Sequence, residues 1–303
     1  DTLTVWNAYT YIDSAGFVDS IVNDNSVNLY NPASYFVVED DSLSIWMDRR
    51  AGAFINNRFS NNPITQGMAT FDGLDYKGDP YDDSFDQAYG LADILTSKPI
   101  KLAGFTETDS VILSFYYQPA GVANPPDFLD SLILQFYNPS QGSWATVWFT
   151  SGQLTQTNFE QVKIHITDQN YLQTGFQFRF KNYSTLSGLY DIWNLDYVYL
   201  NDGRNLVNED IKDMAFISPI ISLIDIYTSM PWEHYKLNPA TYVTGSVNTD
   251  VVNLGLSEVF TERKDEFYDI DGTQLFTNSI ANPFFTPGIQ SVEIPVLDAP
   301  TSF

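Results

Sequence analysis

Apolar and polar residues alternate with a period of two along much of the chain, which is typical of strands with one buried and one wetted face. Turn-forming residues separate these segments. The segments that have this pattern and are rich in β-branched and aromatic residues are 110–117, 130–137, 143–150, 161–166, 175–180 and 192–200. The best helical pattern, 216–227, contains Pro219 and β-branched residues, which weaken it. The spacing of these short strands predicts an all-β fold, a sandwich of two sheets.

The strand pattern weakens near residue 203 and returns after residue 239. We therefore expect a first β-sandwich domain over 1–203, a linking segment over 204–239 and a second β-domain over 240–303. An immunoglobulin-like sandwich needs roughly 100 residues, so this second domain is either a small or a partial one, which would continue beyond Phe303.

Charge excludes one class of partner. The chain has 14 Lys and Arg against 38 Asp and Glu, a formal net charge of −24. Nucleic-acid binding through a basic surface needs clustered Lys and Arg, so we expect no nucleic-acid partner. With 6 Trp, 19 Tyr and 22 Phe, the chain also has too many aromatic residues for an acidic disordered protein.

The chain contains no cysteine, which excludes disulfides, a thiolate metal site and a cysteine nucleophile. No apolar run is long enough for a transmembrane segment. The sequence begins at Asp1 without a basic and apolar leader, as a mature exported protein would after removal of its signal segment.

A series of sequence blocks carries a family resemblance. The blocks are 45–59, 67–81, 88–102, 110–121, 130–139, 175–188, 191–204, 213–216 and 227–235. In this order they resemble exported Bacteroidota proteins with a MAM-like, concanavalin-type jelly roll, from organisms that use type IX secretion and gliding. The resemblance implies a jelly-roll sandwich and a location at the cell surface or the periplasmic face of the outer membrane.

Clustered acidic residues in the loop after residue 71 suggest calcium, which binds six to eight oxygen ligands. The loop carboxylates are Asp72, Asp75, Asp79, Asp82, Asp83 and Asp86, and their spacing does not fit an EF-hand. In the jelly rolls that this chain resembles, a structural cation joins an Asp-Gly loop to the final strand. The resemblance thus implies a structural calcium at Asp72 and Asp75 with Asp191 and Asp196. The alternative is a solvated turn in which Asp side chains cap backbone amides.

Aromatic residues supply the candidate contact sites. Trp144, Trp148 and Tyr117 lie on predicted strands, where exposed rings could stack on sugars. The alternative is that these rings fill the core between the sheets. Met230, Trp232 and Tyr235 belong to an aromatic segment that we expect to dock the two domains together or onto a protein partner.

Catalytic motifs are absent from the sequence. It contains no G-x-S-x-G elbow, P-loop or dinucleotide fingerprint, and its histidines, His165 and His234, are far apart in sequence. If 191–196 is a strand, Asp191 and Asp196 point to opposite faces, which disfavours a pair of glycosidase carboxylates. We therefore expect no enzymatic activity.

The first functional hypothesis is a non-catalytic protein of the cell envelope or cell surface that acts through protein–protein contacts. Its partners would be other envelope or outer-membrane proteins, and it could serve as an accessory subunit of a secretion, gliding or other outer-membrane complex. The alternative is a carbohydrate-binding module or adhesin with a glycan partner. A glycosidase on the same scaffold ranks third.

Overall fold

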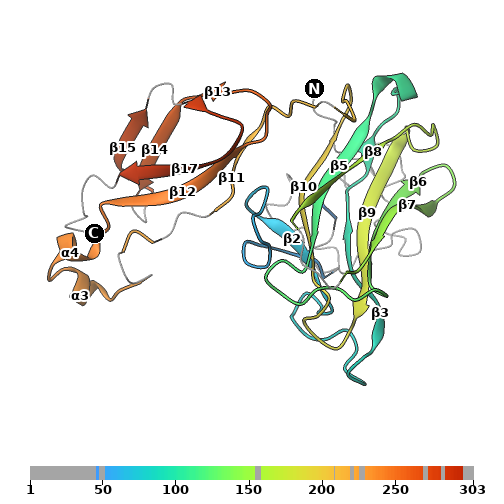
Figure 1. The fold of residues 1–303 in the computed structure, drawn as a ribbon, viewed down its shortest axis with the longest axis horizontal. Coiled ribbons are helices and arrows are strands. Elements are labelled where there is room, and N and C mark those ends of the chain that lie inside the picture. The colour runs from blue at the N-terminus through green and yellow to red at the C-terminus, as the bar shows by residue number, and fades with distance from the viewer. Residues whose placement is uncertain are drawn as a thin grey trace. The chain divides into compact units, whose positions relative to one another are not determined.

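A computed structural model describes residues 46–47, 52–153, 158–207, 209–218, 222–224, 229–268, 272–280 and 284–295. The chain forms two compact units, which are described separately. The first contains the described residues up to Pro63 together with Gly67–Glu209, and the second contains Ile64–Gln66 and the described residues from Asp210 onward. Nearly all the regular structure is antiparallel β-sheet, which confirms the predicted all-β fold class (Figure 1).

One sheet of the first unit has the strand order β1-β2-β10-β5-β8. Its strands are β1 (Phe54–Asn56), β2 (Met68–Phe71), β10 (Trp193–Asn201), β5 (Ile112–Pro119) and β8 (Glu160–His165). The segments 110–117, 161–166 and 192–200, which the alternation pattern picked out, each overlap one of these strands. A short 3-10 helix, Glu107–Asp109, precedes β5.

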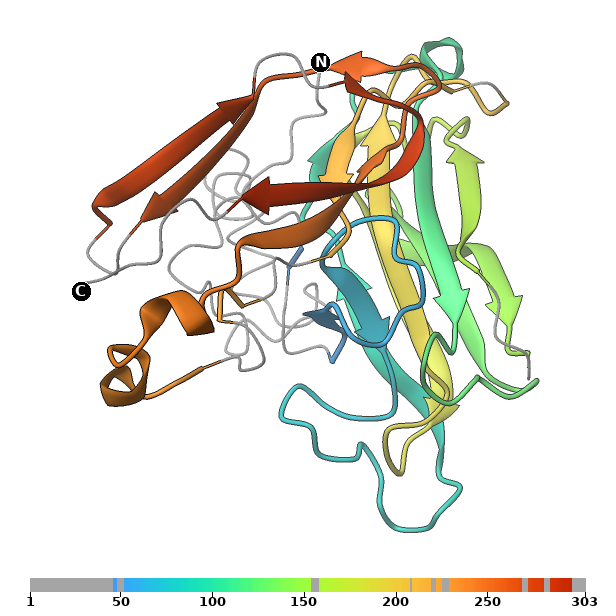
Figure 2. The same ribbon diagram turned by 60° about the vertical axis from the view of Figure 1, so that its left-hand side comes forward.

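The other sheet of the first unit has the order β3-β9-β6-β7, with β4 also paired to β9. Its strands are β3 (Tyr89–Thr96), β9 (Thr174–Thr185), β6 (Ser131–Asn138), β7 (Ser143–Ser151) and β4 (Ile100–Lys101). Figure 1 and Figure 2 show the first unit from two directions. Because β7 follows β6 through a short turn, the pair is an antiparallel hairpin.

Aromatic side chains from both sheets form the core of the first unit. Phe115 of β5 and Phe180 of β9 meet edge to face with ring centroids 4.9 Å apart. Phe176, Phe178 and Phe180 alternate along β9, and all three are buried. Their alternation with polar residues predicted this inward face, and burial of such rings supplies much of the stabilisation of a two-sheet sandwich.

The second unit contains smaller sheets. Its elements are β11 (Met214–Phe216), α3 (Trp232–Tyr235), α4 (Pro239–Tyr242), β12 (Ser246–Asn253), β13 (Val259–Phe260), β14 (Arg263–Tyr268), β15 (Gln274–Ile280), β16 (Phe284–Phe285) and β17 (Gly288–Pro295). Strands β11, β12 and β17 form one sheet, whereas β13 pairs with β16 and β14 pairs with β15. Val247, Val251 and Ile294 are buried in this unit. None of the helices in the described part of the chain has the length and apolar character needed to cross a membrane.

Candidate functional site

The outward-facing positions of the sheet β3-β9-β6-β7 follow from its register. Residues directly opposite one another on paired strands share a face, and the phenylalanines of β9 face the core. The alternate β9 residues therefore face outward, together with their partners on β6, β7 and β3. We call this set the outer face: Gln177, Arg179, Lys181, Tyr183 and Thr185 of β9, Ser131, Ile133, Gln135 and Tyr137 of β6, Trp144, Thr146, Phe149 and Ser151 of β7, and Tyr89, Leu91 and Ile94 of β3. Within it, Gln177, Gln135 and Tyr137 are buried by their neighbours.

Trp144 is held on the outer face by its neighbours on two other strands. The Arg179 guanidinium carbon lies 4.2 Å from the centroid of the Trp144 ring, and the Tyr137 ring centroid lies 5.2 Å from it. Arg179 Nε donates a hydrogen bond of 2.8 Å to Gln135 Oε1. Gln135 Nε2 in turn donates to Thr146 Oγ1 at 3.1 Å. The result is a fixed aromatic ring beside a row of hydrogen-bonding groups.

A second basic and aromatic pair lies further along β9. Lys181 Nζ is 5.2 Å from the centroid of the Tyr183 ring, within cation–π range. Tyr89 of β3 packs beside Tyr183 with centroids 6.5 Å apart, and it is 50% exposed. Phe149, opposite Ile133, is 64% exposed. Large apolar rings exposed on the same face as polar groups are typical of contact surfaces.

The structure places the other two predicted sugar-binding rings in the core. Trp148 packs against Phe115 at 5.1 Å and against Tyr117 at 5.2 Å, between centroids. Tyr117 is 6% exposed and its hydroxyl donates to Glu160 Oε2 at 2.8 Å. Burial and this carboxylate raise the pKa of Tyr117 to about 12. Of the three rings, Trp144 alone lies on the outer face.

The predicted partner-binding residues lie in the second unit. Trp232 and Tyr235, both in α3, stack with centroids 5.5 Å apart. Tyr235 is buried, whereas Trp232 is 41% exposed. Met230 is half-buried just before the helix. The exposed part of this group is thus mainly the Trp232 ring.

Asp72, at the end of β2, forms a buried pair with Asp93 of β3, a residue that the sequence analysis did not single out. The Asp72 backbone N–H donates to Asp93 Oδ2 at 2.7 Å, and the Tyr81 hydroxyl donates to Asp93 Oδ1 at 2.9 Å. Asp72 Oδ1 accepts from the Leu74 N–H at 2.6 Å. Asp72 Oδ2 is buried and has no hydrogen-bond partner.

This pair carries an electrostatic cost. Asp72 is 1% exposed and Asp93 is fully buried, and within the part of the chain that the structure describes neither forms an ion pair. Burial raises the pKa of Asp72 to about 6. Burial also raises the pKa of Asp93 well above its usual range, with a smaller contribution from the Asp72 charge. The buried pair therefore has one unpartnered carboxylate oxygen and no ion-pair partner among the described residues.

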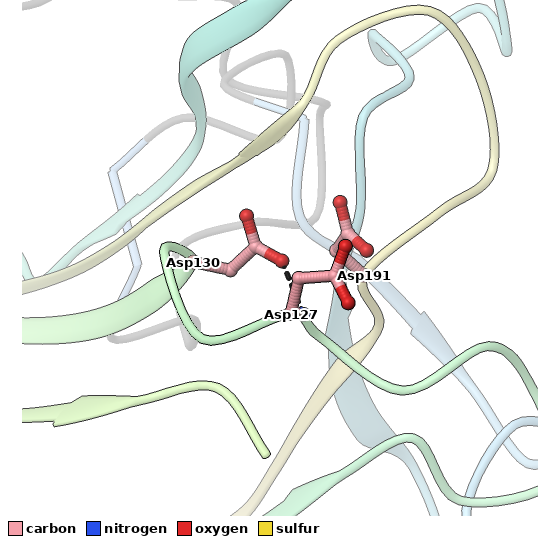
Figure 3. A group of neighbouring side chains, drawn as sticks. All are labelled: Asp127, Asp130 and Asp191. Carbon is pink, nitrogen blue, oxygen red and sulfur yellow. Dashed lines mark hydrogen bonds between the residues drawn. The ribbon is translucent and has the colours of Figure 1, made fainter. Parts of the chain in front are cut away.

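A separate group of carboxylates consists of Asp127, Asp130 and Asp191 (Figure 3). One ligand oxygen from each lies within 4.8 Å of the others. The Asp127 backbone N–H donates to Asp130 Oδ2, and the Thr185 N–H donates to Asp191 Oδ2. Burial and the nearby Asp191 raise the pKa of Asp130 to about 7. This group lies at the loops that precede β6 and β10 (Figure 3).

The structure therefore does not bring the four predicted calcium ligands together at one site. Asp72 pairs with Asp93, and Asp191, which precedes β10, joins Asp127 and Asp130. Asp75 Oδ1 accepts from the backbone N–H groups of Lys77 and Asp79 and so closes a turn. Asp196, within β10, accepts from its own neighbour's amide, the Tyr197 N–H, at 2.7 Å. Asp93 was missed because it lies within a strand-like segment rather than in the acidic loop.

Comparison with known proteins gives weak likenesses only. No family model and no curated protein matches the chain. Among solved structures, it is similar to an arabinose-bound α-L-arabinofuranosidase (10% identity, 55% of this chain and 24% of that one, TM-score 0.33). It is also similar to the non-crystalline-cellulose-specific module CBM28 (12% identity, 52% and 86%, TM-score 0.31). A third is the glycoside hydrolase domain of Endo-D from Streptococcus pneumoniae R6 (10% identity, 80% and 33%, TM-score 0.31).

The chain spans about a quarter of the length of the arabinofuranosidase.

Proposed function

We propose that the first unit binds carbohydrate on its outer face. The observation that carries the proposal is the fixed Trp144 ring beside Arg179, Gln135 and Thr146. A sugar presents patches of C–H groups that stack on aromatic rings and a rim of hydroxyls that need hydrogen-bond partners. Trp144 supplies the ring, the Arg179 guanidinium and the exposed Thr146 hydroxyl supply the partners, and the buried Gln135 amide holds both in place.

Rigidity of the site favours binding. Arg179 and Tyr137 already hold the Trp144 ring before any ligand arrives, so little side-chain entropy is lost when a sugar stacks on it. The outer face lies on paired strands rather than on loops, which also fixes the spacing between the ring and the polar groups.

We propose binding without hydrolysis. A glycosidase needs two carboxyl groups on either side of the scissile bond, about 5–10 Å apart. The outer-face positions defined above contain no Asp or Glu. Asp72 and Asp93 are buried, and Asp127, Asp130 and Asp191 lie in the loops that precede β6 and β10 rather than at the strand positions of the outer face.

A binding assay with matched variants tests this proposal. Wild-type protein, Trp144→Ala and Trp232→Ala would be run in affinity gels that contain neutral or acidic polysaccharides. We expect retardation of the wild type on at least one polysaccharide and a loss of about tenfold or more in affinity for Trp144→Ala, equal to about 1.4 kcal/mol. Trp232→Ala is the control, because it removes an exposed tryptophan from the other unit. Equal retardation of wild type and Trp144→Ala, or none on any polysaccharide, would contradict the proposal.

We also propose that a structural divalent cation, with calcium as the first candidate, binds at Asp72 and Asp93. The orphaned Asp72 Oδ2 is the observation that favours it. Such an ion would neutralise the buried pair and tie the end of β2 to β3. A midpoint of thermal unfolding that rises by several degrees between excess chelator and millimolar calcium, and does so less in Asp93→Asn, is the expected result. An unchanged midpoint would contradict it.

The proposals for the cellular location and the protein partners rest on the family resemblance. We propose an exported protein of the cell envelope, in which glycan binding and contacts with other envelope proteins are compatible because they use different units. The exposed Trp232 ring of α3 is the first residue to substitute when such a partner is sought.

A further inference from the structure

The charges on the outer face are opposite in sign to the net charge of the chain. The whole sequence has 38 acidic and 14 basic residues. On the outer face, the charged residues are Arg179 and Lys181, both cations, at alternate positions of β9. An acidic protein thus presents a positive patch where its aromatic rings are exposed.

The positive charge of this patch depends mainly on Lys181. It is half-buried, and among the described residues it forms no ion pair. Burial and the nearby Arg179 both lower the pKa of Lys181. The two cations lie at alternate positions of one strand, so their charges repel each other. An anionic group of a ligand would relieve this repulsion.

The geometry around the two cations suits a sugar chain rather than a free ion. Lys181 lies over the Tyr183 ring, and Arg179 lies over the Trp144 ring. Between these pairs, Gln135 and Ile133 of β6 occupy the rows opposite Arg179 and Lys181. A chain that crosses these rows would meet an aromatic ring and a cation at each of two places.

We infer that the outer face selects an anionic polysaccharide, one whose sugars bear carboxylate or sulfate groups. This rests on the proposed carbohydrate binding and specifies its substrate class. Lys181 binds the anionic group, while the Trp144 ring stacks on a sugar and Arg179 bonds to its oxygens. Salt screens exposed charges that lie farther away than the Debye length, about 8 Å at physiological salt, so Arg179 and Lys181 act more strongly on a ligand at this face than distant acidic residues do.

Charge-matched polymers test the inference. Affinity would be measured by calorimetry for polygalacturonate and for its carboxyl-reduced, neutral form, and for chondroitin sulfate before and after desulfation. We expect the wild type to prefer an anionic polymer by about tenfold over its neutralised form. A preference confined to one of the two pairs would identify carboxylate or sulfate as the group that is bound.

Two lysine variants distinguish a specific effect of Lys181 on binding from the general effect of removing one positive charge. Lys181→Gln is expected to lose the preference, yet to keep its affinity for the neutral form. Lys77→Gln is the matched control, because Lys77 also lies over a tyrosine ring, 5.4 Å from the Tyr76 centroid, but outside the outer face. It is expected to behave like the wild type.

The outcomes distinguish the two proposals. If neutral and anionic polymers bind equally and Lys181→Gln changes nothing, while Trp144→Ala still abolishes binding, the charge inference is wrong and carbohydrate binding stands. If Trp144→Ala has no effect, or no polymer binds, both are wrong. Circular dichroism and thermal unfolding of each variant would confirm that the fold is retained.

Discussion

The Arg179 side chain makes two contacts on the outer face. Its planar guanidinium covers the Trp144 ring, and its Nε–H is bonded to Gln135. Lysine carries the same charge but cannot stack as a plane or donate in this fixed direction. Arg179 is therefore a positioning residue for Trp144, and in the proposed complex it would also donate to the polysaccharide.

The first prediction concerns Arg179→Lys. We expect this variant to weaken polysaccharide binding by about three- to tenfold, which corresponds to about 1 kcal/mol. The charge is conserved, so the loss must come from the ring contact and the hydrogen bond. Tryptophan fluorescence in titrations with polysaccharide gives the measurement, because a freed Trp144 ring also changes its emission. Unchanged affinity together with an unchanged spectrum would contradict the role.

The second prediction concerns pH and the Asp72–Asp93 pair. The folded-state pKa of Asp72 is raised from 3.8 to about 6, and that of Asp93 is raised as well. In metal-free protein the native state therefore binds more protons than the unfolded chain from about pH 4 to about pH 6. Asp93 extends this difference above pH 6. The stabilisation from protonation is complete below pH 4 and is lost as the pH rises through about 6.

Thermal unfolding in chelator at pH 5 to 8 measures this effect. We expect the midpoint to fall as the pH rises, and Asp93→Asn to make this fall less steep and to raise the midpoint at pH 8. Asp130, whose pKa is raised to about 7, contributes to the slope that remains. Asp83→Asn, which neutralises an exposed carboxylate in the same loop region, is the control. A midpoint that rises with pH in wild type and both variants would show that the buried pair does not control stability here.

Strand β9 links the core to the outer face. Phe176, Phe178 and Phe180 pack inward, and Arg179 and Lys181 at the alternate positions point outward, with β3 and β6 paired to β9 in the same alternation. The sequence FQFRF at 176–180 predicted this two-faced strand, because a period of two has no other simple explanation. The inward and outward positions should therefore respond differently to truncation.

The third prediction compares two phenylalanines of this sheet. Phe180→Ala is expected to destabilise the first unit by about 3–5 kcal/mol, because it leaves a cavity beside Phe115. Phe149→Ala removes a ring that is mostly exposed, so we expect a change of about 0.5 kcal/mol or less. Urea unfolding of both variants measures the difference. Similar losses in the two would mean that the sheet faces are assigned wrongly.

A bulge in β7 explains why the sequence alone could not sort the tryptophans. Trp144 and Trp148 are an even number of residues apart, so a regular strand would put both on one face. The register shifts between Leu134 and Gln135, which inserts Val147 and turns Trp148 into the core while Trp144 stays outside. No turn-forming residue or charge marks the bulge in the sequence.

The acidic clusters were hidden for a different reason. The loop carboxylates after β2 stand out by composition, but Asp93 comes from a strand and Asp127 and Asp130 from the loop before β6. Which carboxylates meet is set by strand pairing over long sequence distances, as in the contact of Asp72 with Asp93. Spacing along the chain carries no information on such pairing.

At the scale of the whole molecule, the net charge of −24 and the two cations of the outer face have opposite effects on an anionic ligand. A net charge of this size favours solubility near neutral pH and repels anionic surfaces in general. The proposed positive patch would offset this repulsion for an anionic ligand that approaches the outer face. The all-β class followed from the alternation pattern, whereas the jelly-roll and immunoglobulin-like topologies stay predictions.

The most direct test of the central claim is side-chain oxidation footprinting with and without a polysaccharide that retards the protein. Hydroxyl radicals modify accessible aromatic rings, so a bound sugar chain protects the rings that it covers. Carbohydrate binding on the outer face predicts protection of Trp144 and Phe149, with Trp232 and Tyr76 unchanged. Protection at Trp232 instead, or at none of these rings while binding persists, would contradict the account.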